Sequence, residues 1–378
     1  MDDPVQVRRL PGLSLRMHPP RVVAHTSSGH CWYPDLLRFA TGQLMLTYSL
    51  NADANDNPHN SQAVCLSGDG GHSFDFAYDV NGFHNAGGEP RLSLPDGRIV
   101  GTSTFLRPDP PGQWRRFAAH HWCFQDGGRR YAVEPWGAHV EGLPAPVQPY
   151  PQASRTWWAR INWFSDIVAL ADDHWVSTLS LRFAGDARET TVALSGADGG
   201  RSWRYLATIA GPDAVPQAGE GFDEPCLLQL ADGDLLCVSR VGSGADQPLA
   251  RTRSSDGGRT WSPVDRLPAY SVAPQLCRLR SGVLALSTGR PGLFLWLSTD
   301  DRGEDWHGVD VMAHHNASVA PAERMTAAQT TAYTAMVEGP SDRLLLVYDR
   351  TPFGWQPVPA GSGEASRIYL LEVEVRRE

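Results

Sequence analysis

The sequence lacks the features expected of nucleic-acid-binding and membrane proteins. Its net charge at pH 7 is −9, and its basic residues are arginines scattered along the chain. Because phosphate groups are neutralised by clustered positive charge, we expect no nucleic-acid partner and no anionic membrane surface as a partner. No window approaches the roughly 18 apolar residues of a membrane-spanning helix. The acidic start, residues 1–4, precedes no apolar stretch, so we predict no signal peptide and a cytoplasmic location.

Cysteine and histidine patterns typical of metal sites are also missing. None of the six cysteines forms a CxxC pair or a tight cluster, and most fall inside predicted strands. This distribution predicts buried free thiols rather than zinc ligands or a disulfide framework. No phosphate-binding loop, dinucleotide fingerprint or serine nucleophile elbow is present. We therefore expect no metal and no cofactor.

Glycine and proline, in contrast, are abundant. The chain has 37 glycines and 29 prolines, which favour turns and disfavour long helices. Its apolar content of 41% and charged content of 20% are typical of a soluble globular protein. The 13 tryptophans provide large apolar surfaces, either for the core or for stacking on a ligand.

A short turn motif, called the repeat turn below, recurs five times. In the first copy, residues 67–74 follow the pattern Ser-x-Asp-x-Gly-x-Ser-aromatic. The aspartate of such a turn accepts backbone N–H groups, and glycine supplies the positive φ. One copy alone is an ordinary hairpin turn, but five copies indicate a repeated structural unit. The later copies begin at Asp126, Asp198, Asp256 and Asp301.

Two apolar strands precede each turn, a sixth pair follows the last turn, and these pairs form a second repeat. The first strands are 33–37, 89–93, 164–168, 224–228, 273–277 and 333–337, and the second strands are 44–48, 99–102, 175–179, 235–238, 283–286 and 344–348. Six such modules predict four-stranded sheets that radiate from an axis, which leaves only short, protected edges. We therefore predict an all-β fold, a six-bladed β-propeller, with residues 1–378 as one domain. The run 367–375 completes the last sheet, alone or together with the N-terminal segment.

These turns, known as Asp boxes, and the strand repeats resemble the sialidase (neuraminidase) superfamily over essentially the whole chain. The resemblance implies a substrate site where the first strands of the modules converge. It also implies a tyrosine nucleophile, a glutamate partner, an aspartate acid/base and three arginines that bind the substrate carboxylate. A phenol with a pKa of about 10 is a weak nucleophile at neutral pH, so a nearby carboxylate must withdraw its proton.

The resemblance assigns the catalytic roles to three residues. Tyr333, in the sequence Thr-Ala-Tyr-Thr, matches the nucleophile, and Glu224 matches its partner. Asp56 lies in the loop before the first repeat turn, where the family has its acid/base, although Asp53 in the same loop competes for this role. Glu224 also has a purely structural interpretation, as the ion-pair partner of Arg240.

The predicted substrate-binding set departs from the family in one place. Arg240 and Arg290 match two of the three arginines, but Trp32 stands where the first arginine belongs. A tryptophan can stack on a sugar ring, but it cannot form the bidentate pair that arginine forms with a carboxylate. Sialic acid is therefore a doubtful substrate, and Arg91 is a candidate replacement for the missing charge. Further polar residues at strand openings are expected to face the substrate: Asp35, Glu89, Asp166, Asp223 and Gln275.

The sequence thus predicts a glycoside hydrolase that cleaves a terminal sugar, neutral or acidic, from an oligosaccharide or glycoside with retention of configuration. Two alternatives stay open. One is a polysaccharide lyase acting on uronic-acid glycans, with a histidine such as His25, His30, His59 or His84. The other is a propeller that binds glycans without catalysis. The sugar, the linkage and the oligomeric state do not follow from the sequence.

Overall fold

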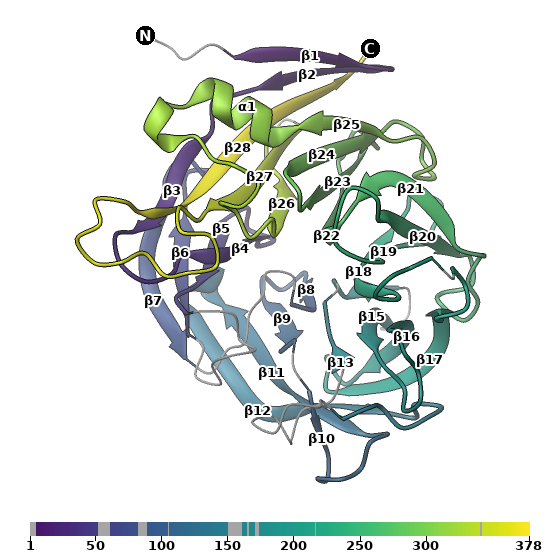
Figure 1. Cartoon of the computed structure of the whole chain (residues 1–378). Helices are drawn as coiled ribbons and strands as arrows, with labels where there is room; N and C mark the ends of the chain where they lie inside the picture. Colours follow the sequence, from purple (N-terminus) through teal and green to yellow (C-terminus); the bar gives the residue numbers. More distant parts are fainter. Residues whose placement is uncertain are drawn as a thin grey trace. The chain divides into compact units, whose positions relative to one another are not determined.

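The computed structural model describes residues 5–51, 61–81, 89–104, 106–149, 161–164, 166–170, 174–215, 217–340 and 342–378. The fold is nearly all β (Figure 1), and the described residues form one α-helix, α1 (Val311–Ser318). The chain divides into two compact units. Unit 1 comprises Met1–Gly87 and Val272–Glu378, and unit 2 comprises Gly88–Ser271.

Unit 1 contains three antiparallel sheets. The first has the order β4 (Trp32–Arg38), β5 (Leu44–Ser49), β6 (Ser61–Ser67), β7 (Asp75–Asn81). The second has the order β22 (Val272–Arg278), β23 (Leu284–Gly289), β24 (Leu293–Ser298), β25 (His307–Asp310). The third has the order β1 (Gln6–Leu10), β2 (Leu13–Met17), β28 (Ser366–Arg377), β27 (Arg343–Arg350), β26 (Thr334–Glu338), and β3 (Arg21–Thr26) also pairs with β28.

Unit 2 contains two sheets. One is four-stranded, with the order β18 (Asp223–Gln229), β19 (Leu235–Arg240), β20 (Pro248–Ser254), β21 (Asp265–Tyr270). The other is ten-stranded, with the order β13 (Ile161–Asn162), β15 (Trp175–Leu181), β16 (Thr190–Ala197), β17 (Ser202–Ala210), β12 (Arg130–Glu141), β11 (Phe117–Gln125), β9 (Ile99–Thr102), β8 (Arg91–Ser93). β10 (Arg107–Pro108) pairs with β11, and β14 (Val168–Ala169) pairs with β15. The two halves of this sheet meet where β12 and β17 run parallel, at residues 139–141 and 202–204.

Most of the predicted strands are confirmed. The two strands of the hairpins beginning at residues 33, 224 and 273 lie within three residues of their predicted bounds, and 99–102 is reproduced as β9. Two predicted first strands are shorter than expected, since 89–93 is reduced to β8 and 164–168 overlaps only β14. Helix α1 was not predicted, although it begins in an ordinary way, with Asp310 accepting the Ala313 N–H at 2.8 Å.

The C-terminal strand joins the two ends of the chain. The predicted run 367–375 lies within β28, which pairs with β27 on one side and with β2 and β3 on the other. Figure 1 shows β1 and β2 beside the C label, at one edge of unit 1. These pairings cover both edges of β28 and leave β1 as the outer strand, so the N-terminal segment does complete the last sheet.

A proline repeat produces the same bulge in three sheets. Tyr33, Glu224 and Ala273 have φ values of 52°, 39° and 45°, and each precedes a proline in the first strand of a hairpin. Because proline has no N–H to donate, the ladder skips there and one extra residue is accommodated. The register passes from Trp32↔Ser49 to Asp35↔Thr47, from Asp223↔Arg240 to Cys226↔Val238, and from Val272↔Gly289 to Gln275↔Ser287. The sequence repeat therefore gives equivalent positions at three strand openings.

The repeat turns are held together by their aspartates. Asp256 accepts the Thr260 N–H at 2.9 Å and the Thr260 hydroxyl at 2.6 Å, while the Ser254 hydroxyl accepts the Gly258 N–H at 2.8 Å. Gly258 has a φ of 89°, and a Cβ there would lie 3.2 Å from Leu206, so glycine is needed for both reasons. The first copy has the same bonds: Asp69 accepts the Ser73 N–H and hydroxyl and the Ser67 hydroxyl, and the Ser67 oxygen accepts the Gly71 N–H.

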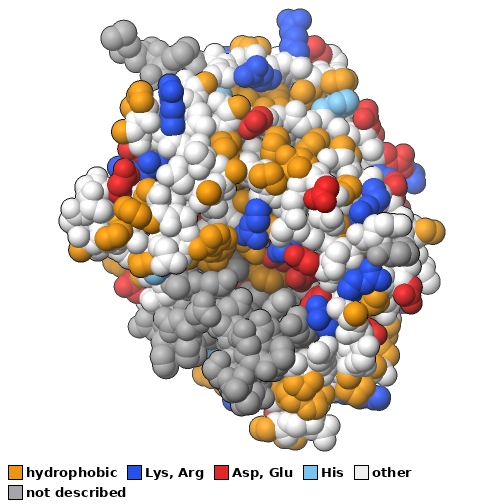
Figure 2. All heavy atoms as spheres, viewed as in Figure 1, with side chains coloured by type: hydrophobic (Ala, Val, Ile, Leu, Met, Phe, Trp, Pro, Cys, Tyr) orange, Lys and Arg blue, Asp and Glu red, His pale blue; other side chains and the backbone are white. Residues whose placement is uncertain are grey.

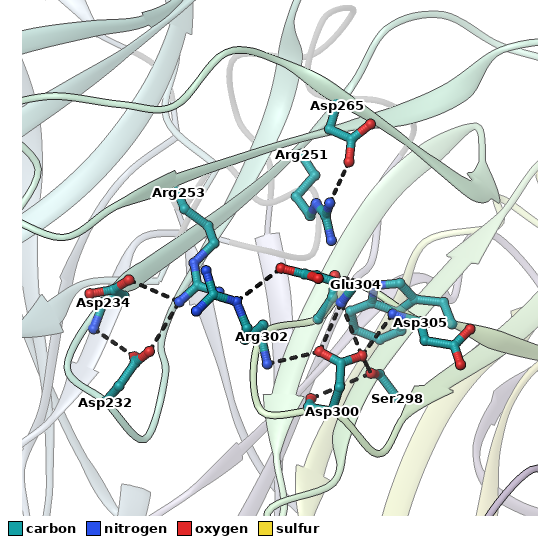
Figure 3. A network of polar contacts seen from close by, with 12 residues as sticks. Asp232, Asp234, Arg251, Arg253, Asp265, Ser298, Asp300, Arg302, Glu304 and Asp305 are labelled. Carbon is teal, nitrogen blue, oxygen red and sulfur yellow. Dashed lines mark hydrogen bonds and ion pairs between the residues drawn. The ribbon is translucent and has the colours of Figure 1, made fainter.

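The copy assigned to Asp301 needs a correction. Asp300, not Asp301, accepts the Glu304 and Asp305 N–H groups at 2.9 and 2.7 Å, and the Ser298 hydroxyl at 2.6 Å (Figure 3). The physical reason is spacing. Ser298 and Asp300 keep the Ser-x-Asp pattern, and the turn then contains one additional residue before its tryptophan. Asp126, in the degenerate copy, starts a short 3₁₀ turn without a side-chain cap.

The second strand of each hairpin forms the core of its sheet. Every residue of β5, β15 and β23 is buried, and β19 is buried except at Arg240. Burial on both faces explains why these segments read as apolar runs rather than as an alternating pattern. The six cysteines are free, and all but Cys277 are buried among these strands. On the face drawn in Figure 2, arginines are interspersed with acidic and apolar side chains.

Candidate active site

The bulge at the start of β18 presents a carboxylate–guanidinium cluster in unit 2. Arg240 donates to Oε1 of Glu224 at 2.9 Å and lies 2.7 Å from Oε2 of Glu220. The side chains of Glu224 and Arg240 are 6% and 12% exposed, so this ion pair is largely shielded from water. The positive φ of Glu224 results from the proline bulge and turns its side chain toward Arg240 at the end of the paired strand. The two predicted residues are thus in direct contact.

Asp223, the residue before Glu224, is an acid with a raised pKa in this cluster. Its Oδ1 accepts hydrogen bonds from the Ser180 hydroxyl and from the Glu224 N–H. Burial raises the pKa of Asp223 to about 6, the negative charge of Glu224 adds to the rise, and Arg240 opposes it. A carboxyl group with such a pKa exchanges a proton near neutral pH, which is what acid–base catalysis requires.

A second polar group in unit 2 contains three predicted residues. Nε of Arg91 lies 3.5 Å from Oδ1 of Asp166, and its Nη1 donates to the backbone oxygen of Glu89 at 3.4 Å. Glu89 is 3% exposed, and the side chain of Asp166 is 40% exposed. Arg91 is therefore charge-paired within its own unit, which weakens its case as a replacement for the missing first arginine.

In unit 1, Tyr333 lies beside Arg290. The Arg290 guanidinium carbon is 5.8 Å from the centre of the Tyr333 ring, and its Nη2 donates to the Thr331 carbonyl at 2.9 Å. Tyr33 packs edge-on against Tyr333 with ring centres 5.0 Å apart. Among the described residues, no carboxylate forms an ion pair with Arg290, whereas Arg240 has two. Of Arg240 and Arg290, both predicted to bind the substrate, Arg290 is therefore the one whose positive charge is not neutralised by a described carboxylate.

Trp32 is packed inside unit 1. It is 1% exposed, and its ring lies edge-on to those of His30 at 4.3 Å, Trp355 at 5.8 Å and Tyr33 at 6.1 Å. The face of the Trp32 ring, which was expected to stack on a sugar, is therefore covered by protein. Asp35, also predicted to bind substrate, is buried and accepts the Leu36 N–H at 2.8 Å. Gln275 is half-buried and pairs in register with Ser287.

A buried carboxylate on β27 holds the segment that carries Tyr333. Asp349 is 0% exposed and accepts the Thr330 hydroxyl at 2.9 Å, the Thr331 N–H at 2.8 Å and the Thr331 hydroxyl at 2.6 Å. It also accepts the Tyr33 N–H at 3.2 Å. The Thr330 hydroxyl in turn accepts the Ala332 N–H at 3.0 Å. Burial raises the pKa of Asp349, and these hydrogen bonds oppose the rise.

The predicted site residues did not include Asp349, Tyr33, Trp355 or Glu220. Asp349 and Trp355 lie outside the aligned strand openings, and Glu220 precedes one, so the repeat alone did not point to them. Tyr33 had a visible signal, since it occupies the same bulge position as Glu224. The predicted acid/base Asp56 and its competitor Asp53 lie outside the described residues, as do His59 and His84.

Unit 2 also contains a cavity of about 580 Å³ lined by side chains that include His121, Glu134, Trp175 and Arg201. None of the predicted site residues lines it. Within the described ranges, no three His, Cys, Asp or Glu side chains gather as ligands for a metal ion. No helix formed by the described residues has the length and apolar character needed to span a bilayer.

Comparison with known proteins identifies the fold. No protein-family model matches the chain, and no curated protein matches its sequence. Solved structures do match. A protein of unknown function from Dyadobacter fermentans has a TM-score of 0.68 at 17% identity, over 97% of this chain and 100% of that one. The α-L-arabinanase of Penicillium chrysogenum, solved with arabinobiose, has a TM-score of 0.62 at 15% identity, over 94% and 98%.

The NanB sialidase of Streptococcus pneumoniae has a TM-score of 0.54 at 12% identity, over 95% of this chain and 70% of that one. The arabinanase and the sialidase are β-propeller glycosidases. This chain is a β-propeller. At these identities the likeness establishes the fold of the propeller and leaves its chemistry to be argued from its own residues.

Proposed function

We propose that this propeller is an exo-acting glycoside hydrolase that works with retention of configuration. The observation that carries the proposal is the adjacency of Tyr333 and Arg290 in unit 1, because it joins a predicted nucleophile to a guanidinium that has no carboxylate partner among the described residues. The Glu224–Arg240 pair of unit 2 and the glycosidase names of the arabinanase and the sialidase are consistent with it.

The proposed reaction has two steps. First, the Tyr333 oxygen attacks the anomeric carbon, and two carboxylates accept the phenol proton and protonate the departing glycosidic oxygen, roles for which the sialidase resemblance proposes Glu224 and Asp56. Second, water attacks the same carbon, Asp56 accepts a proton from this water, and the bond between carbon and Tyr333 breaks as Glu224 returns the proton to the phenolate. The sugar leaves with its original configuration because it is inverted twice.

The substrate we propose is a glycan with a terminal sugar, neutral or acidic, for which sialic acid is the disfavoured candidate. Trp32 replaces the first arginine of the sialidase triad and is buried, and Arg91 and Arg240 are each engaged by carboxylates. Arg290 alone can bind one carboxylate of a uronic or ulosonic acid, or the hydroxyls of a neutral sugar. Arg240 then serves mainly to orient Glu224.

We also propose that residues 1–378 form six blades as one domain. The ten-stranded sheet would count as two blades joined by the β12–β17 pair, and each of the other four sheets would supply one. The repeat turns would then be Asp boxes, as in the sialidase superfamily. Co-operative unfolding of the full chain, with a single transition, is the expected behaviour, and two separate transitions would contradict the one-domain proposal.

Hydrolysis of a panel of aryl glycosides, including arabinofuranosides, uronides and sialosides, tests the enzymatic proposal. Native protein should release the aryl group from at least one, and Tyr333→Phe should reduce release to background. Tyr205→Phe is the matched control, since among the described residues it removes a hydroxyl whose hydrogen bond goes to the exposed Thr208 hydroxyl at 3.0 Å. Glu224→Gln should lower kcat by about 100-fold or more. Undiminished activity of Tyr333→Phe would remove Tyr333 from the mechanism.

The same panel separates the two alternatives. A lyase would produce an unsaturated uronide, seen as a rise in ultraviolet absorbance, without consuming water. A binding propeller would retain glycans on an array with both Tyr333→Phe and Glu224→Gln and would turn over no substrate.

A further inference from the structure

Trp355 is an exposed aromatic residue beside the predicted nucleophile. It is 47% exposed, although a tryptophan gains most from burial. The Arg290 guanidinium carbon lies 5.2 Å from the centre of its ring, and the Tyr33 ring lies 6.1 Å away at an interplanar angle of 46°. Both Arg290 and Tyr33 also contact Tyr333. The indole is therefore part of the surroundings of Tyr333 and yet retains free surface.

The loop that carries Trp355 is anchored at both ends. At one end, the Thr351 N–H donates to the Gln329 carbonyl at 2.8 Å, and the Gln329 side chain donates to the Pro352 carbonyl at 3.2 Å. At the other end, Val358 and Gly29 exchange two backbone hydrogen bonds of 2.9 and 3.0 Å. An aromatic residue on an anchored loop loses little conformational entropy when it binds a ligand.

Trp32 supports Trp355 from within the protein. Its buried ring meets that of Trp355 at 85° with the centres 5.8 Å apart, which is the favourable edge-to-face arrangement. The tryptophan that replaces the first arginine therefore acts as packing beneath an exposed tryptophan. This gives Trp32 a physical role that does not require contact with a sugar.

We propose that Trp355 forms a sugar-binding subsite next to Tyr333, in which a sugar ring packs its apolar C–H face on the exposed indole while Arg290 binds a hydroxyl or carboxylate of the same glycan. The ligand class is an oligosaccharide with at least two sugar units, one for the reacting position and one for the indole. The subsite rests on the proposed function for the identity of its ligand as a glycan. It deepens that function by naming the residue that selects for chain length.

Binding and hydrolysis are measured with Trp355→Ala, Trp355→Phe and Trp355→Leu in the full chain. The disaccharide probes are arabinobiose, sialylgalactose and a digalacturonide, each compared with its monosaccharide methyl glycoside. Phe353→Ala is the matched control, because Phe353 is 39% exposed on the same loop. Thermal unfolding of every variant verifies that the fold is retained. Binding by calorimetry is measured in the Glu224→Gln background, so that the probe is not consumed.

The parent protein, with Trp355 intact, should bind each disaccharide probe more tightly than the matching monosaccharide glycoside. Trp355→Ala should weaken disaccharide binding by about tenfold or more, with KM rising more than kcat falls and with monosaccharide binding nearly unchanged. Trp355→Phe should retain most of the preference, because a flat ring is kept, and Trp355→Leu should not, because apolar volume alone gives no flat face. Phe353→Ala should behave like the parent protein.

Two results overturn the subsite. The first is equal disaccharide binding by the parent protein, Trp355→Ala and Trp355→Leu. The second is absence of binding to all three probes by a folded parent protein. Loss of hydrolysis with intact, Trp355-dependent binding has a different meaning, since it contradicts the proposed reaction and leaves the subsite standing.

Discussion

Asp349 provides the sharpest test of how unit 1 holds Tyr333. Its buried carboxylate accepts four hydrogen bonds, three from Thr330 and Thr331 and one from the Tyr33 N–H. Asp349→Ala removes all four acceptor contacts at once. Because Thr330 and Thr331 are 5% and 1% exposed, water cannot replace the carboxylate without opening this segment.

The magnitude follows from the number of donors left without a partner. A buried donor that loses its acceptor costs about 1–3 kcal/mol, and the lower value applies to threonine hydroxyls, which can rotate toward other acceptors. The lower value of about 1 kcal/mol for all four donors, two hydroxyls and two backbone N–H groups, gives a loss of at least about 4 kcal/mol for Asp349→Ala. Asp349→Asn keeps one acceptor oxygen and should lose about 2 kcal/mol, because an N–H₂ group then faces the Tyr33 N–H.

Urea denaturation at pH 7, followed by tryptophan fluorescence, measures both losses. Asp301→Asn is the control, since it makes the same chemical change on a side chain that is 71% exposed, and it should stay within about 0.5 kcal/mol of the native protein. The two Asp349 variants should also lose activity on any glycoside that the native protein cleaves, because Tyr333 follows the held segment directly. Values for both variants within about 0.5 kcal/mol of native would refute the reasoning.

Three further outcomes are expected. Arg240→Met should lower the free energy of unfolding by about 3–5 kcal/mol, because it leaves the Glu224 carboxylate, 6% exposed, without its counter-charge. Glu224→Gln should cost less. Equal losses of the two variants in urea denaturation would contradict this. Hydrogen bonds from Thr260 lower the pKa of Asp256 to about 2, below the value of about 3.9 in an unfolded chain, so stability is lost as pH falls from 4 to 2, and Asp256→Asn should flatten the unfolding profile in that range. The pKa of Asp223 is raised to about 6 by burial, so the folded state holds a proton that the unfolded chain has released, and stability falls as pH rises from 4 to 6. Asp223→Asn should remove that fall, and an unchanged pH profile would show that Asp223 does not titrate there.

Several features were predictable because they depend on neighbouring residues. The repeat turn around Asp256 is made by hydrogen bonds within seven residues, Ser254 to Thr260, so its pattern in the sequence is also its structure. The same holds for the prolines after Tyr33 and Glu224, which impose a bulge wherever they interrupt a strand. The contact between Glu224 and Arg240 follows as well, since the two residues face each other across one hairpin.

Other features depended on distances that no repeat reveals. Trp32 was expected to offer a stacking face, but Trp355, far along the chain, covers it and is itself exposed. Arg290 and Arg240 looked equivalent in the sequence. The structure separates them, because Glu220 adds a second carboxylate to Arg240 alone.

The sequence by itself therefore determined the repeated elements: the turns, the bulged strand openings and the strand that ends the chain. Their physical cause is local, since turn chemistry and a missing proline N–H act over a few residues. Only the tertiary structure decided which side chains surround Tyr333. Asp349 and Tyr33 are brought together across 316 positions by the packing of β27 and β4, and burial then decides which charges and rings stay available to a ligand.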